Sequence, residues 1–228
     1  MAPQAFAAEE LEMNVSFPLA LPILGTSADD FANSVNAISS DIKIKTFEPG
    51  KLVPALEALD AVSAGSVDMS YAVSGYWQGK ISSASFFTAV PFGPEASEFM
   101  GWIYFDDGHR LWQKMYDDNG YNVVAMPFGM IAPETSGWFR EEIKSLEDLN
   151  GLNMRFFGLG AQVMQKLGVS TSLLAGGDIM PALERGTIDA TEFSFPRVDA
   201  RLGFHKIAKF NYFPGWHQPA SILELLIN

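Results

Sequence analysis

A pattern of eight residues occurs twice in the chain, as AVSAGSVD at residues 61–68 and as ALERGTID at residues 182–189. Each copy reads as the end of a helix, a glycine at the cap, and a β-branched residue that begins a strand. Gly65 and Gly186 suit the cap because glycine enters the left-handed backbone conformation at little steric cost. This repeated helix-to-strand step predicts two similar α/β lobes, although a motif this short also recurs by chance. Two lobes form a cleft, which is a usual place for a small ligand.

Patterns of strand and helix alternate around the first copy of this motif. Helical patterns cover residues 28–39 and 52–64, where apolar residues recur on one face. Strands are predicted around these helices, at residues 11–17, 41–47 and 67–73. The order β-α-β-α-β is typical of a largely parallel sheet. The predicted fold class is therefore α/β, with two lobes that each hold a mostly parallel sheet flanked by helices.

The chain is predicted to cross between the lobes near residues 124 and 212. Lobe 1 then comprises residues 11–124, with residues 213–228 returning to it, and lobe 2 comprises residues 125–212. No low-complexity linker marks either crossing.

Residues 1–10 read MAPQAFAAEE. Ala5, Phe6 and Ala7 resemble the A-x-A end of a secretory signal whose charged and apolar parts are missing, and an alanine-rich tail is the alternative. A signal remnant predicts export to the periplasm. No run of about 18 apolar residues occurs, so no membrane span is predicted.

The composition excludes several functions. The formal net charge is −12, which argues against nucleic acid as a partner because phosphate binding needs patches of Lys and Arg. The chain has no cysteine, which excludes disulfides, thiol catalysis and cysteine-bound zinc. The three histidines, His109, His205 and His217, show no metal-binding spacing. Because no nucleophile motif or dinucleotide fingerprint occurs, the sequence gives little support for an enzyme.

Two charged residues stand where α/β sheets bind ligands. Arg155 ends a predicted strand that reads Leu152-Asn153-Met154-Arg155, and a glycine-containing step then leads into a helix. Strand ends that face a helix N-terminus are frequent anion sites, and a guanidinium suits a carboxylate. Glu192 shares the core side of its predicted strand with Ile188, so it must be paired, protonated or bound to a cation. A surface ion pair for Arg155 and a structural salt bridge for Glu192 are the alternatives.

Several short motifs occur together along the chain. The most specific are the Gly-Leu-x-Met-Arg step that ends at Arg155 and the Pro-Gly-Trp segment at residues 214–216. The others lie at residues 54–68, 86–93, 137–140, 145–151 and 203–209. Together they resemble the substrate-binding proteins of tripartite ATP-independent periplasmic (TRAP) transporters, closest to the subgroup that binds 2-oxo or 2-hydroxy monocarboxylates. The resemblance covers residues 11–228 and implies a two-lobed fold like that of periplasmic binding proteins, with the ligand between the lobes.

This resemblance implies roles for individual residues. Arg155 matches the arginine that clamps the ligand carboxylate. Glu192 matches an acidic residue that helps hold a metal ion between protein and ligand. Phe193 stands where the subgroup has tryptophan and would offer its backbone carbonyl to the ion, and Gln218 falls at a further metal position.

Glu134 falls where the resemblance leads us to expect glutamine, so it is a candidate for contact with both ligand and metal. With Glu192 it would place two carboxylates near one cation, which favours a divalent ion such as Ca²⁺ over Na⁺. Ligand binding without a metal is the alternative. The candidate aromatic walls of the site are Tyr76, Trp77 and Trp216.

The function that the resemblance implies is that of a periplasmic solute-binding protein rather than an enzyme. It would capture a small 2-oxo or 2-hydroxy monocarboxylate, of the pyruvate or lactate class, and deliver it to the subunits of a TRAP membrane permease. A sodium or calcium ion would bridge the ligand, and no organic cofactor is implied. The alternatives are a dicarboxylate or sugar-acid binder of the same family, a lyase or hydrolase with Glu192 as base, and a sensor that uses the same cleft.

The resemblance also implies that a C-terminal segment of the family is absent. Family members run considerably longer, whereas the chain ends at residues 222–228 on an apolar segment that reads as a strand without a polar tail. Apolar surface that the longer segment covers in the family would then be exposed.

Overall fold

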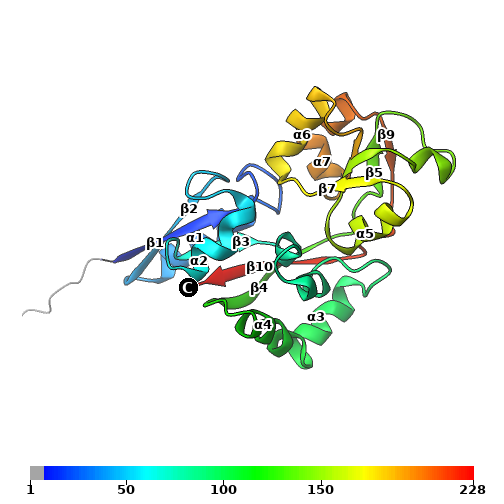
Figure 1. Cartoon of the computed structure of the whole chain (residues 1–228). Coiled ribbons are helices and arrows are strands. Elements are labelled where there is room, and N and C mark those ends of the chain that lie inside the picture. The colour runs from blue at the N-terminus through cyan, green and yellow to red at the C-terminus, as the bar shows by residue number, and fades with distance from the viewer. Residues whose placement is uncertain (1–7) are drawn as a thin grey trace, which may run out of the picture.

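The computed structural model describes residues 8–228, which form two α/β lobes lying side by side (Figure 1). Each lobe is built on a five-stranded sheet flanked by helices, which confirms the α/β class and the two lobes predicted from the sequence. Each sheet is mixed rather than mostly parallel, because one of its strands runs antiparallel to both of its neighbours. The signal remnant predicted at residues 1–10 falls largely outside the described residues. Its last two residues, Glu9 and Glu10, belong instead to the first strand of the fold.

The sheet of lobe 1 has the strand order β2-β1-β3-β10-β4. β1 runs parallel to β2 and β3, as predicted, whereas β10 runs antiparallel to β3 and β4. The C-terminal strand therefore lies inside the sheet, with both of its edges paired. The elements of lobe 1 are β1 (Glu9–Val15), α1 (Thr26–Ile38), β2 (Ile42–Phe47), α2 (Ala58–Ser63), β3 (Met69–Ala72), α3 (Ala96–Phe105), α4 (Gly108–Asp118), β4 (Val124–Ile131) and β10 (Ser221–Ile227).

The sheet of lobe 2 has the strand order β7-β6-β8-β5-β9. β6 runs parallel to β7 and β8, and β5 runs antiparallel to β8 and β9. Because β6 and β8 are neighbours, the residues that follow them lie close together at one end of the sheet. The elements of lobe 2 are β5 (Gly137–Phe139), β6 (Asn153–Arg155), α5 (Gly158–Lys166), β7 (Ser170–Ser172), α6 (Gly176–Arg185), β8 (Ala190–Thr191), α7 (Pro196–Leu202) and β9 (Phe210–Tyr212).

The two copies of the sequence motif adopt the same local structure. Gly65 follows α2 with φ +71°, and Gly186 follows α6 with φ +70°. Their N–H groups donate back to the carbonyls of Val62 and Leu183 at the ends of the two helices. After each glycine the chain enters a strand that runs parallel to its neighbour in the sheet, β3 in lobe 1 and β8 in lobe 2.

The crossings between the lobes differ in part from the prediction. β4 pairs with β10 along its length from Val124 to Ile131, so residues 125–131 belong to lobe 1. The first crossing therefore lies between Ile131 and Gly137 rather than near residue 124, because the long partner strand β10 extends the pairing. The return crossing lies between Tyr212 and Ser221.

A buried carboxylate lies in the core of lobe 1. Glu224, on β10, has an exposed fraction of 0%. The indole N–H of Trp77 donates to its Oε1 at 2.7 Å, and the hydroxyl of Tyr116 donates to its Oε2 at 2.7 Å. Burial raises the pKa of Glu224 to about 7, although these two donors offset part of the rise.

We expect this carboxyl group to make the ligand-free protein less stable as the pH rises. The unfolded chain ionises Glu224 near its ordinary pKa of 4.5, whereas the folded chain keeps the proton up to about 7. The folded state therefore binds more protons in this window, and the free energy of unfolding falls as the pH rises through it. Glu224→Gln should therefore show a smaller decrease in melting temperature with rising pH than the wild type, as measured by circular dichroism. Glu141→Gln, at an exposed position, is the matched control, and equal pH profiles for Glu224→Gln and the wild type would contradict the prediction.

Candidate functional site

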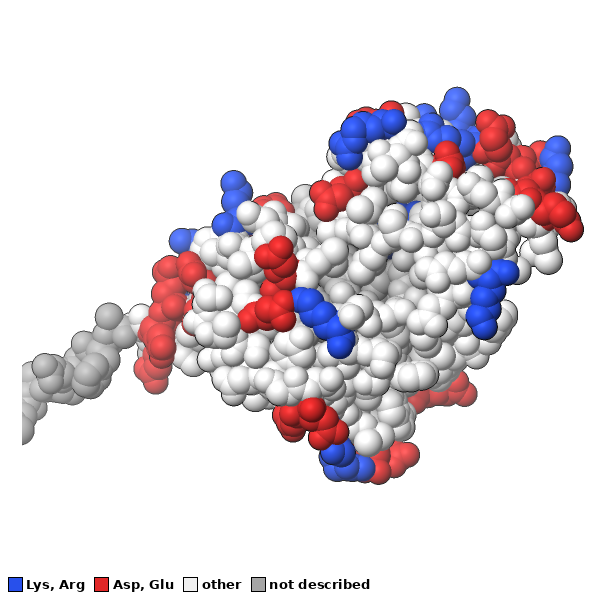
Figure 2. Space-filling model, in the orientation of Figure 1, with Lys and Arg blue, Asp and Glu red and all other residues white. Residues whose placement is uncertain are grey.

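A small cavity lies between the lobes, beside both crossings. Lobe 1 contributes mainly apolar side chains to it, while lobe 2 and the crossing segments contribute most of the polar ones. Figure 2 shows charged side chains on the outer parts of both lobes and few in the hollow between them. The lining residues are Phe17, Leu24, Val73, Tyr76, Ile131, Glu134, Arg155, Phe157, Phe193, Gln218 and Ser221.

Arg155 is the only Lys or Arg among the lining residues of this cavity. It is the last residue of β6, and its exposed fraction is 1%. Its Nε donates to the carbonyl oxygen of Leu174 at 3.1 Å. Its Nη1 donates to the carbonyl oxygen of Glu192 at 2.9 Å and to Oε1 of the same residue at 2.7 Å. Acceptors from two different segments therefore fix the position of the guanidinium.

These contacts decide how Arg155 can meet a ligand. A guanidinium has five N–H groups, and the acceptors just named occupy those of Nε and Nη1. Only Nη2 remains to donate to a ligand. The usual bidentate pair, in which two guanidinium nitrogens donate to the two oxygens of one carboxylate, therefore cannot form here. The second carboxylate oxygen needs another donor. Oη of Tyr76 and Nε2 of Gln218 line the same cavity, and both are buried without a hydrogen-bond partner among residues 8–228.

Glu192 directly follows β8 and is fully buried. Its Oε1 accepts from Nη1 of Arg155 and from the backbone N–H of Phe157, the latter at 2.5 Å. Its Oε2 has no hydrogen-bond partner in the described part of the chain. Burial raises the pKa of Glu192 to about 7; Arg155 lowers it in part, and Glu134 raises it further.

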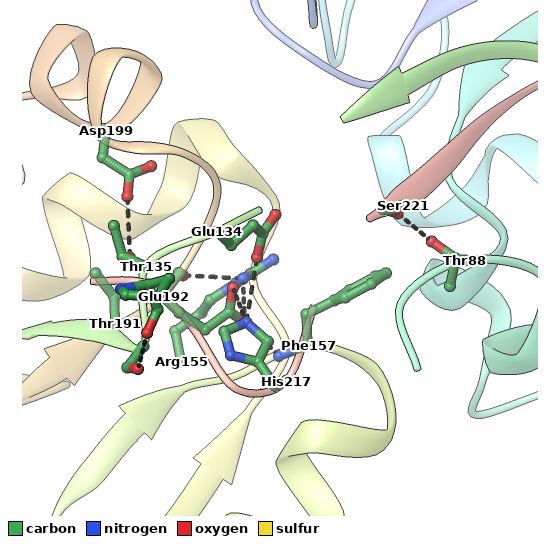
Figure 3. A network of polar contacts seen from close by, with 12 residues as sticks. Thr88, Glu134, Thr135, Arg155, Phe157, Thr191, Glu192, Asp199, His217 and Ser221 are labelled. Carbon is green, nitrogen blue, oxygen red and sulfur yellow. Dashed lines mark hydrogen bonds and ion pairs between the residues drawn. The ribbon is translucent and has the colours of Figure 1, made fainter. Parts of the chain in front are cut away.

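Glu134 and His217 lie on the two crossing segments, which run side by side. The N–H of Gly215 donates to the carbonyl of Glu134 at 2.6 Å, and the N–H of Glu134 donates to the carbonyl of Gln218 at 3.3 Å. This pairing places Nε2 of His217 3.2 Å from Oε2 of Glu134 and 3.9 Å from Oε2 of Glu192 (Figure 3). Burial raises the pKa of Glu134 to about 8 and lowers the pKa of His217.

The arrangement fits a bound cation. Glu134, Glu192 and His217 each offer one ligand atom, and these atoms lie within 4.8 Å of one another. Two buried carboxylates stand beside one guanidinium, and Oε2 of Glu192 lacks a donor. Both carboxyl groups have raised pKa values because each is costly to ionise in this setting. A cation at this place would neutralise them and fill the vacant position on Oε2.

The structure brings most of the candidate residues to one place. Five of them line the cavity: Tyr76, Glu134, Arg155, Phe193 and Gln218. Glu192 does not line it but accepts a hydrogen bond from Arg155.

Two candidate aromatic walls, Trp77 and Trp216, do not line the cavity. Trp77 and Tyr76 are consecutive in a 3₁₀ turn, Ser74–Trp77, and consecutive side chains of such a turn point about 120° apart. Tyr76 therefore faces the cavity, while Trp77 enters the core of lobe 1. Trp216 is half-buried and lies against Phe92 and Phe156.

The sequence reasoning missed two residues of the site. His217 was set aside because the histidines show no metal-binding spacing, but the three donor residues come from three separate segments, which spacing cannot detect. Phe157 was missed as well, although it lies two positions after Arg155 at the start of α5. The signal for His217 was its position directly before Gln218, which the resemblance had already marked as a metal position.

The model of the family described as bacterial extracellular solute-binding protein, family 7 (DctP), matches residues 20–228. The chain belongs to this family. The resemblance to TRAP substrate-binding proteins is thereby confirmed, and the family consists of solute-binding proteins rather than enzymes. Among residues 8–228 of this chain, no helix is both long enough and apolar enough to cross a membrane.

Three relatives are similar along nearly the whole DctP-family chain. A monocarboxylate 2-oxoacid-binding periplasmic protein of Nostoc sp. is 43% identical over 219 residues, which are 95% of this chain and 59% of that protein. A TRAP transporter solute-binding protein of Bordetella bronchiseptica, solved with calcium and picolinate, has a TM-score of 0.93 at 37% identity and covers 98% of this chain and 66% of its own. A TRAP periplasmic solute-binding protein of Pseudoalteromonas atlantica, solved with sodium and pyruvate, has a TM-score of 0.91 at 36% identity. The match covers 97% of this chain and 67% of that protein. The chain thus spans about three fifths of the length of the Nostoc protein.

Proposed function

We propose that this chain binds a small 2-oxo or 2-hydroxy monocarboxylate, of the pyruvate or lactate class, together with a cation, in the periplasm. The complex would then be presented to a TRAP membrane permease. The observation that carries the proposal is a buried guanidinium with Nη2 available, set beside two buried carboxylates in a cavity between two lobes. Capture between lobes that close on the ligand needs no chemical turnover.

The residues divide the work of binding between them. Nη2 of Arg155 would donate to one carboxylate oxygen of the ligand. The hydroxyl of Tyr76 and Nε2 of Gln218, which line the cavity without a partner among the described residues, would be candidate donors to the other oxygen. Glu134 and Glu192 would hold the cation, with the carbonyl of Phe193 and the side chain of Gln218 as further candidates. When bound, the cation neutralises the carboxylates and attracts the 2-oxygen of the ligand. Such buried charges are stable only when they are paired in this way.

The cavity favours a small monocarboxylate over the alternatives. A dicarboxylate would need a second cationic partner, and Arg155 is the only Lys or Arg in the lining. A sugar acid needs many polar partners, yet Phe17, Leu24 and Val73 make the lobe 1 side apolar. The Nostoc relative is named for 2-oxoacids and the Pseudoalteromonas structure contains pyruvate, which supports the same class.

A thermal-shift and calorimetric screen tests the proposal. Protein stripped of metal is titrated with pyruvate, lactate, succinate and glucuronate, each with Na⁺, with Ca²⁺ and with a chelator. We expect pyruvate or lactate with a cation to raise the melting temperature most, because binding to the folded state stabilises it. Stronger binding of succinate or glucuronate would contradict the proposed ligand class. A pyruvate affinity that neither chelator nor sodium changes would show that no cation takes part in binding. Consumption of a 2-oxo acid by the protein would instead support the enzyme alternative.

A further inference from the structure

Two of the short sequence motifs, at residues 86–93 and 214–216, meet in the folded chain. No residue of either motif lines the ligand cavity, so ligand contact does not account for them. The backbone N–H of Phe92 donates to the carbonyl oxygen of Trp216 at 3.2 Å. The centroids of their two rings lie 6.0 Å apart, at an interplanar angle of 35°. The motifs therefore form one contact, made by both backbone and side chains.

This contact joins lobe 1 to lobe 2. Phe92 lies in lobe 1, shortly before α3. Trp216 lies on the return crossing, and its ring packs on the core of lobe 2, where its centroid is 6.0 Å from that of Phe156. Gly215 helps to fix its position, because an added Cβ would lie 2.8 Å from the carbonyl oxygen of Glu134 and push the two crossings apart. The Phe92 ring thus meets a tryptophan that is held by the opposite lobe.

The backbone of Phe92 is strained. The N–H of Gly93 donates to the carbonyl of Val90 at 2.9 Å, which closes a β-turn. Pro91 is the second residue of this turn, and Phe92 is the third, with φ +52°. Proline followed by a positive φ is typical of a type II turn, in which the third position favours glycine or asparagine. A bulky residue there is an outlier, and such outliers cluster at ligand clamps and switch regions.

Core packing does not explain why phenylalanine occupies this position. The exposed fraction of Phe92 is 81%, and Trp216 is its one aromatic neighbour within residues 8–228. A ring this exposed adds little to the stability of lobe 1. Its contact with Trp216, in contrast, depends on the two lobes being together.

We propose that Phe92 and Trp216 form a latch outside the ligand cavity, which holds the lobes together and slows release of the ligand. The inference rests on the proposed function, because it concerns how that ligand is retained. An aromatic pair of this kind stabilises the contact between the lobes without touching the ligand. Recognition is left to Arg155 and the other residues that line the cavity.

The test compares release of pyruvate, in buffer with Na⁺ and Ca²⁺, from the wild type and from Phe92→Gly. Glycine suits the turn and removes the ring, so the melting temperature of the ligand-free variant should stay close to that of the wild type. We expect release in a stopped-flow experiment to be about 2- to 12-fold faster, the range for loss of one aromatic pair, with little change in the association rate.

Phe105→Ala is the matched control, because Phe105 is 91% exposed at the end of α3. It should change neither rate. Release from Phe92→Gly at the wild-type rate, or equal acceleration in Phe105→Ala, would overturn the proposal. A large loss of melting temperature in Phe92→Gly would also overturn it, because the ring would then support the fold of lobe 1.

A second measurement needs no ligand. The chain has no cysteine, so Asn33→Cys on α1 and Glu184→Cys on α6, both at exposed positions, provide the only labelling sites. Double electron–electron resonance between spin labels at these sites reports the distance between the lobes. Adding Phe92→Gly should broaden the distance distribution of the ligand-free protein, because the lobes are then less restrained. An unchanged distribution would overturn the proposal.

The two measurements separate the inference from the proposed function. A broader distribution in Phe92→Gly, together with a wild type that binds no 2-oxo or 2-hydroxy acid, would contradict the function and support the latch. Pyruvate binding by the wild type, with a release rate and distances that Phe92→Gly leaves unchanged, would support the function and overturn the latch.

Discussion

Replacing Arg155 with alanine is expected to reduce the affinity for a small monocarboxylate by about 30- to 4,000-fold, since truncating one partner of a buried charge pair costs about 2–5 kcal/mol. The variant removes Nη2, which is the part of the guanidinium left for the ligand. No other Lys or Arg lines the cavity to replace it.

The same change should also lower stability. Oε1 of Glu192 would keep only the N–H of Phe157 as a donor, and the carbonyl of Leu174 would lose its contact with Nε. Breaking a buried ion pair costs about 3–5 kcal/mol, although protonation of Glu192, whose pKa is already raised, should relieve part of this cost. Arg155→Lys should be intermediate, because an ammonium cannot reach all the acceptors that the planar guanidinium contacts.

Calorimetric titration of the variants, at a temperature where circular dichroism shows each to be folded, checks both expectations. Arg110→Ala is the matched control, because Arg110 forms only an exposed ion pair with Asp107. It should leave both the ligand affinity and the melting temperature unchanged. Binding by Arg155→Ala at the wild-type level would show that Arg155 does not hold the ligand.

Replacing Gly75 with alanine is expected to reduce ligand affinity by about 5- to 150-fold through a different route, because overpacking costs about 1–3 kcal/mol. A Cβ on Gly75 would lie 2.3 Å from Cζ of Phe157. Gly75 belongs to lobe 1 and Phe157 to lobe 2, and the Phe157 ring also lies edge-on against Tyr76 at 5.8 Å. Figure 3 shows this ring extending from the charged cluster toward Ser221 and Thr88 on the opposite lobe. The added methyl group should therefore hold the lobes apart.

Small-angle scattering and calorimetry check this prediction together. Gly75→Ala should keep a larger radius of gyration than the wild type when ligand is present. The double variant Gly75→Ala/Phe157→Ala should recover part of the affinity, since it removes the clashing ring. Gly79→Ala is the matched control, because nothing lies within 4 Å of a Cβ placed there. Wild-type affinity in Gly75→Ala would show that this contact does not limit closure.

The contact between the Phe157 ring and lobe 1 is joined to the ligand site through hydrogen bonds. The backbone N–H of Phe157 donates to Oε1 of Glu192, and that same oxygen accepts from Arg155. A ligand on Arg155 and a cation on Glu192 would therefore both act on the residue whose ring reaches lobe 1. The residues that hold the charges of the ligand site are in this way directly joined to the contact between the lobes.

Local patterns were enough to predict the building blocks of the fold. A glycine between a helix and a strand has few conformations open to it, so Gly65 and Gly186 indicated the same αL cap in both lobes, with φ values of +71° and +70°. Arg155 was placed at a strand end by the glycine-containing step that follows it, and the structure puts it there. Glu192 was expected on the core side of its strand, where it must be paired, protonated or bound to a cation; it is buried and forms an ion pair with Arg155. Each of these inferences depends on residues within a few positions of one another.

Tertiary structure alone decided how those parts meet. The direction of Trp77, into the core beside Glu224 rather than into the cleft, depends on the rotation of a single 3₁₀ turn and on a strand 147 positions later. The extent of β4 depends on its pairing with the C-terminal strand. The cluster of Glu134, Glu192 and His217 exists because two crossing segments lie side by side next to the end of β8. The sequence by itself determined which local conformations were allowed, whereas distances between residues far apart in the chain were set by packing and strand pairing, which no local pattern encodes.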